Sequence, residues 1–297
     1  MINFRTIKVE DKTLYSKHTV GDRLSGCEMS FANLFLWGDQ KIAFIHDCLA
    51  FFSTFSRSFY PMPMGKGDKK KVIDEIILDA KERNIPLTIS SISQKDKEFL
   101  EENYPNKFDF ISKEGSFDYV YAIDDLADLA GKKYHKKRNH LAQFKKACPE
   151  YKVENINIDN IHKVKEMVDK WYMEKQKSDP ENDFGYERDF FDRAMANYFE
   201  LNLEGLMITC GGEVVAVTFA SQMEEDTFDV HFEKAFSDVA GAYVVINNEF
   251  AKYIRNKYPK IKFLDREEDM GIEGLRKAKQ SYYPVSQIIK YVANCKV

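Results

Sequence analysis

The stretch LEGLMITCGGEVVAVTFAS, residues 203–221, contains the clearest secondary-structure signal in the chain. Two apolar runs flank the pair Gly211-Gly212, which is a typical signal for a two-stranded β-hairpin. A third apolar run, TFDVHFEKAF at residues 227–236, follows directly and is expected to form the next strand of the same sheet. The elements around this hairpin therefore decide the fold class.

Further elements on both sides of the hairpin alternate between helical and extended patterns. In the second half, helices are expected at residues 159–177, 187–200, 242–258 and 272–279, and strands at 260–265 and 286–292. In the first half, strands are expected at 42–45, 49–55, 58–64, 85–90 and 107–112, and helices at 68–84 and 93–104. Strands that alternate with helices in this way predict α/β domains with mixed sheets.

Both halves contain one order of elements, a hairpin followed by strand, helix, strand, helix and strand. Corresponding elements lie roughly 165 to 180 residues apart, which is the length of a domain rather than of a solenoid repeat. The residues barely match between the halves. The alternative that two α/β halves show the same order of elements by chance therefore stays open. We expect an N-terminal domain at residues 1–130, a basic junction helix at 131–148 and a C-terminal domain at 149–297.

The bulk composition is that of a globular protein, with 44% hydrophobic residues, a formal net charge of -4 and a pI near 6.0. This balance argues against general coating of nucleic acid, which depends on net phosphate neutralisation. The N-terminus lacks the apolar core of a signal peptide. The most apolar segment, residues 41–55, is too short and too polar to span a bilayer. We therefore expect a cytoplasmic protein without an integral membrane segment.

The five cysteines are scattered and include no C-x-x-C pair, so free and reduced thiols are expected. The six histidines show no metal-ligand spacing. The sequence contains no G-x-S-x-G, P-loop or dinucleotide motif. No metal or redox cofactor is therefore expected.

The segment KKYHKKRNHLAQFKKA, residues 132–147, carries seven Lys or Arg residues and no acid. On a helix that turns about 100° per residue, one stripe contains four largely apolar side chains and three cations within or beside it. The apolar members are Tyr134, Leu141, Phe144 and Cys148, and the cations are Lys137, Arg138 and Lys145. Part of the basic charge is thus expected on the side that packs against the protein.

Three interpretations of these cations stay open. Their aliphatic stems can cover an apolar seam while the charged groups reach water. Arg138 can instead pair with an acid and tie the two halves together. Alternatively, Lys137, Arg138 and Lys145 line a cleft between the halves and attract a phosphate or carboxylate, since a local positive field concentrates anions.

Two segments carry a family resemblance. FDYVYAIDDLADLAGKKYHKKRNHLAQFKK at residues 117–146, together with LDREEDMGIEGLRKAKQSYYP at 264–284, resembles the bacterial family named for the C-terminal domain of phosphatidylglycerol lysyltransferase. That family is similar in turn to the Fem-type peptidoglycan aminoacyltransferases. The resemblance covers about Ser30 to Tyr291 and implies two tandem acyltransferase folds of the GNAT type.

The resemblance also implies functional residues. The family's Lys-Arg-Asn signature falls on Lys137, Arg138 and Asn139, and its Gly-Leu-x-x-x-Lys pattern ends at Lys279. In the Fem-type enzymes this lysine is thought to face the reacting ester, where a cation stabilises the developing oxyanion. The membrane lysyltransferases carry a long transmembrane half that this sequence lacks, so a soluble acceptor is at least as well supported as a lipid.

In GNAT-type domains, donor and acceptor meet beside the third strand of the pattern, which here is TFDVHFEKAF. Asp229, His231 and Glu233 share one face of that strand. Transfer to an amine needs a base that removes a proton from the attacking nitrogen. His231 is the expected base because histidine ordinarily titrates near working pH, and Glu233 is the alternative. The face can also simply be exposed to solvent.

An acidic run follows the strand at 260–265, at a sheet edge where α/β folds often bind ligands. Asp265, Glu267 and Asp269 of this run are expected to bind a cationic aminoacyl or acceptor group. They can equally be partners for the basic helix.

An acyl-CoA enzyme of this fold usually presents a glycine-rich turn to the pyrophosphate at the start of the long helix. Here that turn reads FSDVAGAYVV, with the single glycine Gly241 and with Asp238 where a phosphate would be repelled. Coenzyme A is therefore the less favoured donor.

Three functions remain open. We expect a GNAT-fold acyltransferase that moves an aminoacyl group from aminoacyl-tRNA to an amine or hydroxyl of a small-molecule or peptide acceptor. The proposed donor-binding residues are Lys137, Arg138, Asn139 and Lys145, and the proposed catalytic residues are His231, Glu233 and Lys279. The alternatives are an acyl-CoA N-acyltransferase and a non-catalytic module of the same fold that binds a ligand or partner.

Overall fold

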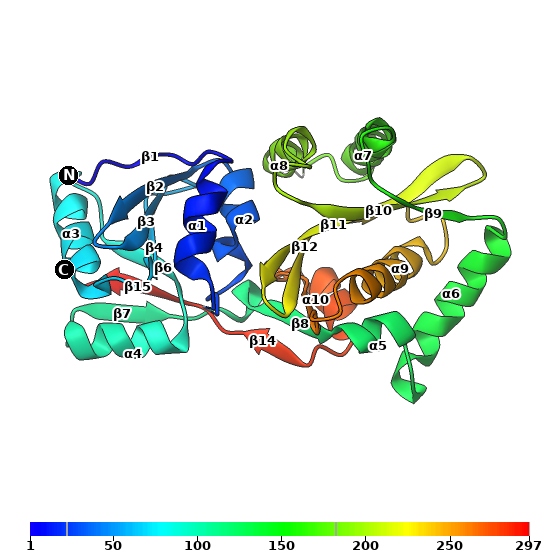
Figure 1. Cartoon of the computed structure of the whole chain (residues 1–297). Coiled ribbons are helices and arrows are strands. Elements are labelled where there is room, and N and C mark those ends of the chain that lie inside the picture. Colours follow the sequence, from blue (N-terminus) through cyan, green and yellow to red (C-terminus); the bar gives the residue numbers. More distant parts are fainter. Residues whose placement is uncertain (22, 182, 297) are drawn as a thin grey trace. The chain divides into compact units, whose positions relative to one another are not determined.

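The computed structural model describes residues 1–21, 23–181 and 183–296 (Figure 1). The chain forms two compact units. The first unit contains Met1–Asp118, Glu268–Arg276 and the chain from Gln287 onward, and the second contains Tyr119–Glu267 and Lys277–Ser286. The sequence-based boundaries, which place an N-terminal domain at 1–130, a junction helix at 131–148 and a C-terminal domain at 149–297, stay a prediction.

The first unit combines two four-stranded sheets with four helices. Its helices are α1 (Asp11–Thr19), α2 (Phe31–Leu36), α3 (Lys69–Glu82) and α4 (Gln94–Asn103), with 3-10 turns at Cys27–Met29 and Glu114–Ser116. Its strands are β1 (Arg5–Thr6), β2 (Gln40–Ile45), β3 (Cys48–Ser53), β4 (Tyr60–Pro61), β5 (Met64–Gly65), β6 (Thr88–Ile92), β7 (Phe108–Ile111) and β15 (Tyr291–Cys295). The sheet orders are β1-β2-β3-β5 and β4-β6-β15-β7.

Helix α3 illustrates how the sequence builds this unit. The Asp68 side chain accepts a hydrogen bond from the backbone N–H of Lys71 and so caps the helix. Val72, Ile73 and Ile76 lie on its buried face and join the core of the unit. The last strand, β15, lies between β6 and β7 and is antiparallel to both. The C-terminal end of the chain therefore completes the sheet of the first unit.

The second unit is built on one seven-stranded sheet with the order β14-β8-β13-β12-β11-β10-β9. Its strands are β8 (Asp118–Ala122), β9 (Lys152–Asn155), β10 (Glu204–Cys210), β11 (Glu213–Glu224), β12 (Thr227–Ala235), β13 (Phe263–Asp265) and β14 (Ser286–Ile288). Its helices are α5 (Ile123–Asp128), α6 (His135–Ala147), α7 (Ile161–Ser178), α8 (Gly185–Ala196), α9 (Ala242–Lys257) and α10 (Glu273–Gln280), with a 3-10 turn at Lys132–Tyr134. Three of these elements continue into the first unit, which includes Asp118 of β8, Glu273–Arg276 of α10 and Gln287–Ile288 of β14.

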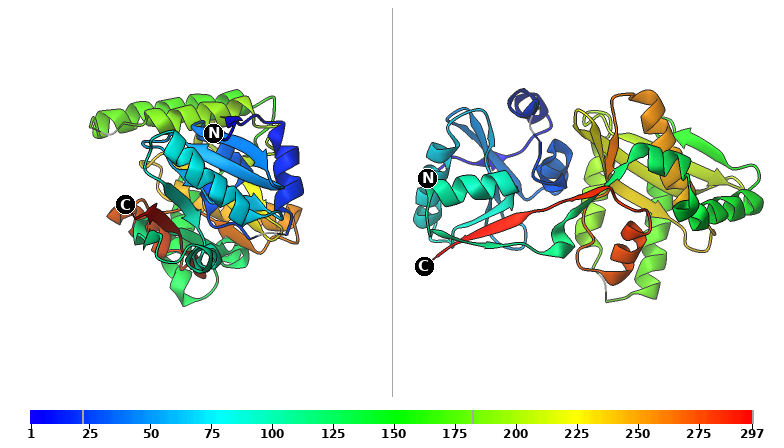
Figure 2. Two further views of the ribbon diagram at one scale, coloured as in Figure 1. Left: turned by 90° about the vertical axis from the view of Figure 1, so that its left-hand side faces the viewer. Right: turned by 90° about the horizontal axis from the view of Figure 1, so that it is seen from below.

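The predicted hairpin is confirmed. Strands β10 and β11 pair in antiparallel register, with Cys210 opposite Glu213. Gly211 and Gly212 both have positive φ, 59° and 88°, which suits the tight turn between right-twisted strands. Helices α7 and α8 cover one face of the sheet and α9 covers the other (Figures 1 and 2). The sheet is therefore buried on both sides, which explains why β12 is polar and yet largely enclosed.

The stripe predicted for the basic segment is also present in the structure. The apolar side of the basic segment packs against the rest of the second unit. It contains Tyr134 and Phe144, which are fully buried, Cys148, which is buried, and Leu141, which is partly buried. Lys137 is half-buried beside them, whereas Arg138 and Lys145 are exposed. Among the described residues, no helix is long and apolar enough to cross a membrane.

The cysteine prediction is wrong for one pair. Cys148 at the end of α6 and Cys210 at the end of β10 form a disulfide, with a Cα–Cα distance of 5.6 Å and a sequence separation of 62. Cys27, Cys48 and Cys295 are free thiols, as expected. The scattered spacing hid the pair, because only the fold brings the end of α6 to the hairpin.

Reducing this disulfide is expected to lower the free energy of unfolding by about 2–4 kcal/mol, because the bond closes a long loop in the unfolded chain. Urea denaturation with and without dithiothreitol measures the effect. A Cys148→Ser/Cys210→Ser variant should reproduce the reduced protein and lose all response to dithiothreitol. Equal denaturation midpoints for oxidised and reduced wild-type protein would contradict the assignment.

Candidate functional site

The candidate site of the second unit begins at His231 in β12. The register between β11 and β12 shifts at this point, because Phe232 pairs with Phe219 while Val230 pairs with the next residue, Ala220. This β-bulge leaves His231 without a cross-strand partner of its own, as is common next to functional sites. Sequence alternation alone could not reveal the bulge.

The His231 side chain is fully buried. The alternative interpretation, that this face of the strand is simply exposed to solvent, is therefore excluded for His231. Its Nε2 lies 2.8 Å from the Ser221 hydroxyl oxygen. Its Nδ1 lies 3.3 Å from Asp229 Oδ2 and 3.7 Å from Glu267 Oε1. Only Glu267 of these partners has a partly exposed side chain. Any proton exchange between His231 and solvent therefore passes beside Glu267.

Within the residues that the structure describes, two groups of side chains have ligand atoms close enough together to hold a metal ion. The first is Asp229, His231 and Glu267 in the second unit. The second is Cys27, Asp118 and Glu268 in the first unit. In that second group the ammonium of a buried lysine, Lys290, lies 2.7 Å from Asp118 Oδ1. The positive charge beside this carboxylate is thus supplied by a side chain rather than by a metal ion. Sequence spacing gave no signal for either group, because each is assembled from distant segments.

Glu233, two residues after His231, is the ion-pair partner of Arg266. The Glu233 Oε1 to Arg266 Nη2 distance is 2.7 Å, and both side chains are largely buried. Asn247 on α9 donates a second, longer hydrogen bond of 3.4 Å to Glu233. Burial acts to lower the pKa of Arg266, but Glu233 and nearby tyrosines more than offset it, so that pKa is raised. Glu233 is thus committed to Arg266.

Lys137 of α6 joins this ion pair through an aromatic ring. The Lys137 ammonium lies 3.5 Å from the centre of the Tyr282 ring, and the Arg266 guanidinium lies 5.1 Å from the same centre. Lys137 Nζ also donates a hydrogen bond of 2.7 Å to the Ser281 hydroxyl. Burial, reinforced by the positive charge of Arg266, lowers the pKa of Lys137 to about 8.

Strongly shifted pKa values, such as that of Lys137, cluster at functional sites. Lys137 comes from one family-like motif, and Arg266 and Tyr282 come from the other. We call Lys137, Glu233, Arg266 and Tyr282 the cationic cluster. The two motifs therefore meet around these side chains of the second unit.

Lys279 supports the turn that carries Arg266. Its ammonium donates to the backbone carbonyl of Arg266 and, at 3.2 Å, to that of Glu267. Glu267 has a φ of 57°, in the left-handed region that a residue with a Cβ adopts at a cost. The buried Lys279 side chain thus holds this turn in place. An oxyanion-stabilising role for Lys279 remains a prediction.

The other residues of the Lys-Arg-Asn signature lie away from the cationic cluster. Arg138 Nη1 donates to the backbone carbonyls of Leu129 and Gly131, at 2.5 and 2.7 Å, and so braces the loop before α6. Asn139 is exposed and contacts His135 at 3.4 Å. Lys145 is exposed near the other end of the helix. Only Lys137 of the predicted donor-binding residues is brought to the candidate site.

The three predicted acceptor-binding acids are not brought together. Asp265 is fully buried, and its Oδ1 accepts a hydrogen bond of 2.8 Å from the backbone N–H of Glu267. Asp269 belongs to the first unit, where Arg276 Nε donates to it at 2.7 Å. Glu267 alone lies beside His231. The three acids therefore have three different environments. Asp265 stabilises a turn, Asp269 forms an ion pair with Arg276, and Glu267 lies at the candidate site.

The start of α9 is closed by another helix. Gly241 has a φ of 83°, and a Cβ built on it would lie 2.3 Å from the carbonyl oxygen of His140 in α6. Only glycine fits this close approach. Helix α6 thus packs directly against the turn at the start of α9.

Sequence reasoning missed four residues around the site, namely Arg266, Tyr282, Ser221 and Asn247. The first two stand inside the quoted C-terminal motif, so a search for a cation stacked on an aromatic ring in that motif could have found them. Ser221 and Asn247 carry no local signal, because only strand pairing and helix packing bring them to His231 and Glu233.

Comparison with known proteins places these observations in a family. The chain matches the family model described as phosphatidylglycerol lysyltransferase, C-terminal, over residues 23–294. A conserved protein of unknown function from Bacteroides thetaiotaomicron VPI-5482 is 36% identical, with 100% of both chains covered and a TM-score of 0.93. Among proteins of curated function, none matches the chain in sequence.

Two more distant structures share the fold. L-PGS from Bacillus licheniformis is 15% identical, with 98% of this chain and 92% of that chain covered and a TM-score of 0.67. FemX is 11% identical, with 98% of this chain and 97% of that chain covered and a TM-score of 0.59. The expected fold, mixed α/β in two tandem GNAT-like parts, is thereby confirmed. Since the family match spans nearly the whole chain, the protein belongs to the family of phosphatidylglycerol lysyltransferase C-terminal domains.

Proposed function

We propose that the protein is an aminoacyltransferase that moves an aminoacyl group from aminoacyl-tRNA to an amine or hydroxyl of a soluble acceptor. The observation that carries this proposal is the cationic cluster, in which the Lys137 ammonium and the Arg266 guanidinium both lie near the Tyr282 ring, 3.5 and 5.1 Å from its centre. Two cations on one aromatic ring can bind the phosphate next to a charged 3′ end, and family membership favours this donor.

In the proposed reaction, the acceptor nitrogen attacks the carbonyl carbon of the aminoacyl ester. The new C–N bond forms, the ester C–O bond breaks and the ribose hydroxyl oxygen leaves with a proton. The attacking nitrogen loses a proton, which we assign first to the partly exposed Glu267 and then to His231 behind it, 3.7 Å away. Lys137 and Arg266 stabilise negative charge on the donor. Lys279 acts by holding the turn that carries Arg266 and Glu267.

Glu233, the alternative base, has a different role in this proposal. Its carboxylate is paired with Arg266 at 2.7 Å, so it orients the guanidinium rather than accepting the proton. Arg138, which binds the backbone carbonyls before α6, positions the helix that carries Lys137.

The donor is tested by binding measurements on the full chain. Fluorescence anisotropy is expected to show that Lys137→Met weakens binding of charged tRNA at least about tenfold, as loss of a charge-assisted contact predicts. Lys136→Met, at an exposed neighbouring lysine of α6, should leave binding within about twofold. Calorimetry should show that any dissociation constant for coenzyme A is above about 1 mM.

The opposite pattern would favour the alternatives. Submillimolar coenzyme A binding would favour an acyl-CoA N-acyltransferase despite the helix packed at Gly241. Binding of tRNA that responds equally to Lys136→Met and Lys137→Met would contradict a role for the cationic cluster.

A further inference from the structure

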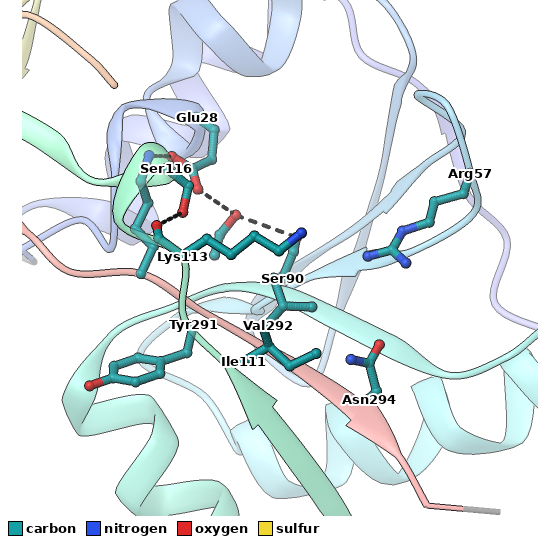
Figure 3. A pocket seen from close by; sticks show the side chains of 11 residues that line it. Glu28, Arg57, Ser90, Ile111, Lys113, Ser116, Tyr291, Val292 and Asn294 are labelled. Atoms are coloured by element: carbon teal, nitrogen blue, oxygen red, sulfur yellow. Dashed lines mark hydrogen bonds and ion pairs between the residues drawn. The ribbon is translucent and has the colours of Figure 1, made fainter. Parts of the chain in front are cut away.

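The first unit contains a cavity of about 290 Å³ that lies outside the candidate site (Figure 3). Its walls come from strands β6 and β15, the end of β7 and the segment after it, and the loop after β3. The volume lies at the lower end of the range for small-molecule pockets. The space is therefore of a size for a small metabolite.

The two strands that form the wall both depart from regular geometry here. Ser91 in β6 has a φ of 54°, although it is a buried strand residue with a Cβ. The register of β15 against β6 shifts between Tyr291 and Ala293. Bulges and left-handed residues are costly in a sheet interior and concentrate at binding sites. Both irregularities lie in the lining of the cavity.

Two cations reach the cavity without an acidic partner. Figure 3 shows the side chains of Arg57 and Lys113 pointing into the pocket from opposite sides. In the part of the chain that the structure describes, neither side chain forms a hydrogen bond or ion pair. The positive charge of these two side chains is therefore not neutralised by an ion pair within the described part of the protein.

The third cation of the lining, Lys290, is different. Its ammonium lies 2.7 Å from Glu28 and 2.7 Å from Asp118. Glu28 also accepts a hydrogen bond of 3.1 Å from the Ser91 hydroxyl. The one acid of the lining is thus engaged by Lys290 and Ser91, and it does not neutralise Arg57 or Lys113.

A neutral hydrogen-bond donor completes the polar wall. The Thr88 hydroxyl donates to Oδ1 of Asn294 at 3.1 Å, and this bond does not use the N–H groups of the Asn294 amide. Ile111 and Val292 supply apolar surface beside these polar groups. The cavity therefore combines cations, an amide donor and an apolar wall, which is the composition of a pocket for a small anion with a hydrocarbon part.

We propose that the first unit binds a small organic anion in this cavity, with its carboxylate or phosphate between Arg57 and Lys113. The Asn294 amide donates to the same anionic group, and the hydrocarbon part of the ligand contacts Ile111 and Val292. This site is independent of the transfer chemistry proposed for the second unit, so each proposal can fail without the other.

Isothermal titration calorimetry on the full chain in low-salt buffer tests the proposal, with glycerol 3-phosphate and succinate as probes. At least one probe is expected to bind with a dissociation constant below about 1 mM, and Arg57→Gln/Lys113→Gln should weaken that binding at least about tenfold. Tighter binding of glycerol 3-phosphate would identify a phosphate ligand, and tighter binding of succinate a carboxylate.

The matched control removes two exposed cations of the same unit that do not line the cavity, Lys66→Gln/Lys95→Gln. It lowers the net charge equally and should leave binding within about twofold. The proposal is overturned if neither probe binds at about 10 mM, or if the control weakens binding as much as Arg57→Gln/Lys113→Gln. All four substituted residues are exposed, so folding is not at stake.

Discussion

An Arg266→Met substitution is expected to lower the free energy of unfolding by about 3–5 kcal/mol, because it leaves a largely buried carboxylate without its partner. Glu233 lies 2.7 Å from the Arg266 guanidinium, and the two side chains are only 11% and 14% exposed. The substitution also removes the stacking of Arg266 on Tyr282. Urea denaturation of the wild-type and variant proteins measures this loss.

Two further variants distinguish the effect of the unpaired Glu233 carboxylate on stability from the effect of losing an arginine side chain in general. In Arg266→Met/Glu233→Gln the buried charge is gone, so most of the lost stability should return. Arg188→Met removes an exposed partner of Asp169 at 3.0 Å and should cost no more than about 1 kcal/mol. If the double variant were as unstable as Arg266→Met, the ion pair would not be the source of the effect.

Binding of charged tRNA is expected to weaken about tenfold between pH 7 and pH 9, because Lys137 loses its charge across this range. Burial lowers the pKa of Lys137 to about 8. Below that pH the side chain is a cation that attracts phosphate, and above it the side chain is a neutral amine. Fluorescence anisotropy at constant ionic strength across this pH range measures the change.

Substitutions at Lys137 make this test specific. Lys137→Arg keeps its charge throughout the range, so the pH dependence should disappear while binding persists. Lys137→Met should bind weakly at every pH. The exposed control Lys136→Met should keep the wild-type pH dependence. A wild-type profile in Lys137→Arg would show that another group titrates.

Much of the fold follows from local pattern. The glycine pair between two apolar runs predicted the β10–β11 hairpin, because such a turn requires positive φ at both positions. The expected helix at 68–84 corresponds to α3 (Lys69–Glu82), whose cap and apolar face are both local signals. Elements of this kind are specified by residues within a few turns of one another.

Other elements depend on distant partners and were missed. The expected strand at 58–64 is divided into β4 and β5, which belong to different sheets. Pro61 and Pro63 lack the N–H groups that a continuous strand would need. The expected strand at 286–292 is likewise divided into β14 and β15, again in different sheets. Local pattern cannot specify which sheet an edge segment joins.

The candidate site was predictable to a similar extent. Alternation along β12 identified His231 and Glu233, and the helical stripe identified Lys137, Arg138 and Lys145, of which Lys137 is half-buried and the other two are exposed. Sequence could not show that Glu233 is engaged by Arg266, or that Asp265 and Asp269 have partners elsewhere. The Glu233–Arg266 contact joins residues 33 positions apart, and the contacts of Asp265 and Asp269 depend on the local conformation of the chain after β13.

The central claim, stated for an amine acceptor, is that the second unit catalyses transfer from aminoacyl-tRNA, and loss of the tRNA ester tests it most directly. Purified protein is mixed with tRNA charged with radiolabelled amino acids and with a pool of soluble amines. We predict that the label leaves tRNA faster than by spontaneous hydrolysis, only when amines are present, and appears in an alkali-stable amide. Lys136→Met should react like the wild type and Lys137→Met more slowly. Ester loss at the spontaneous rate with wild-type protein and every amine would contradict the claim.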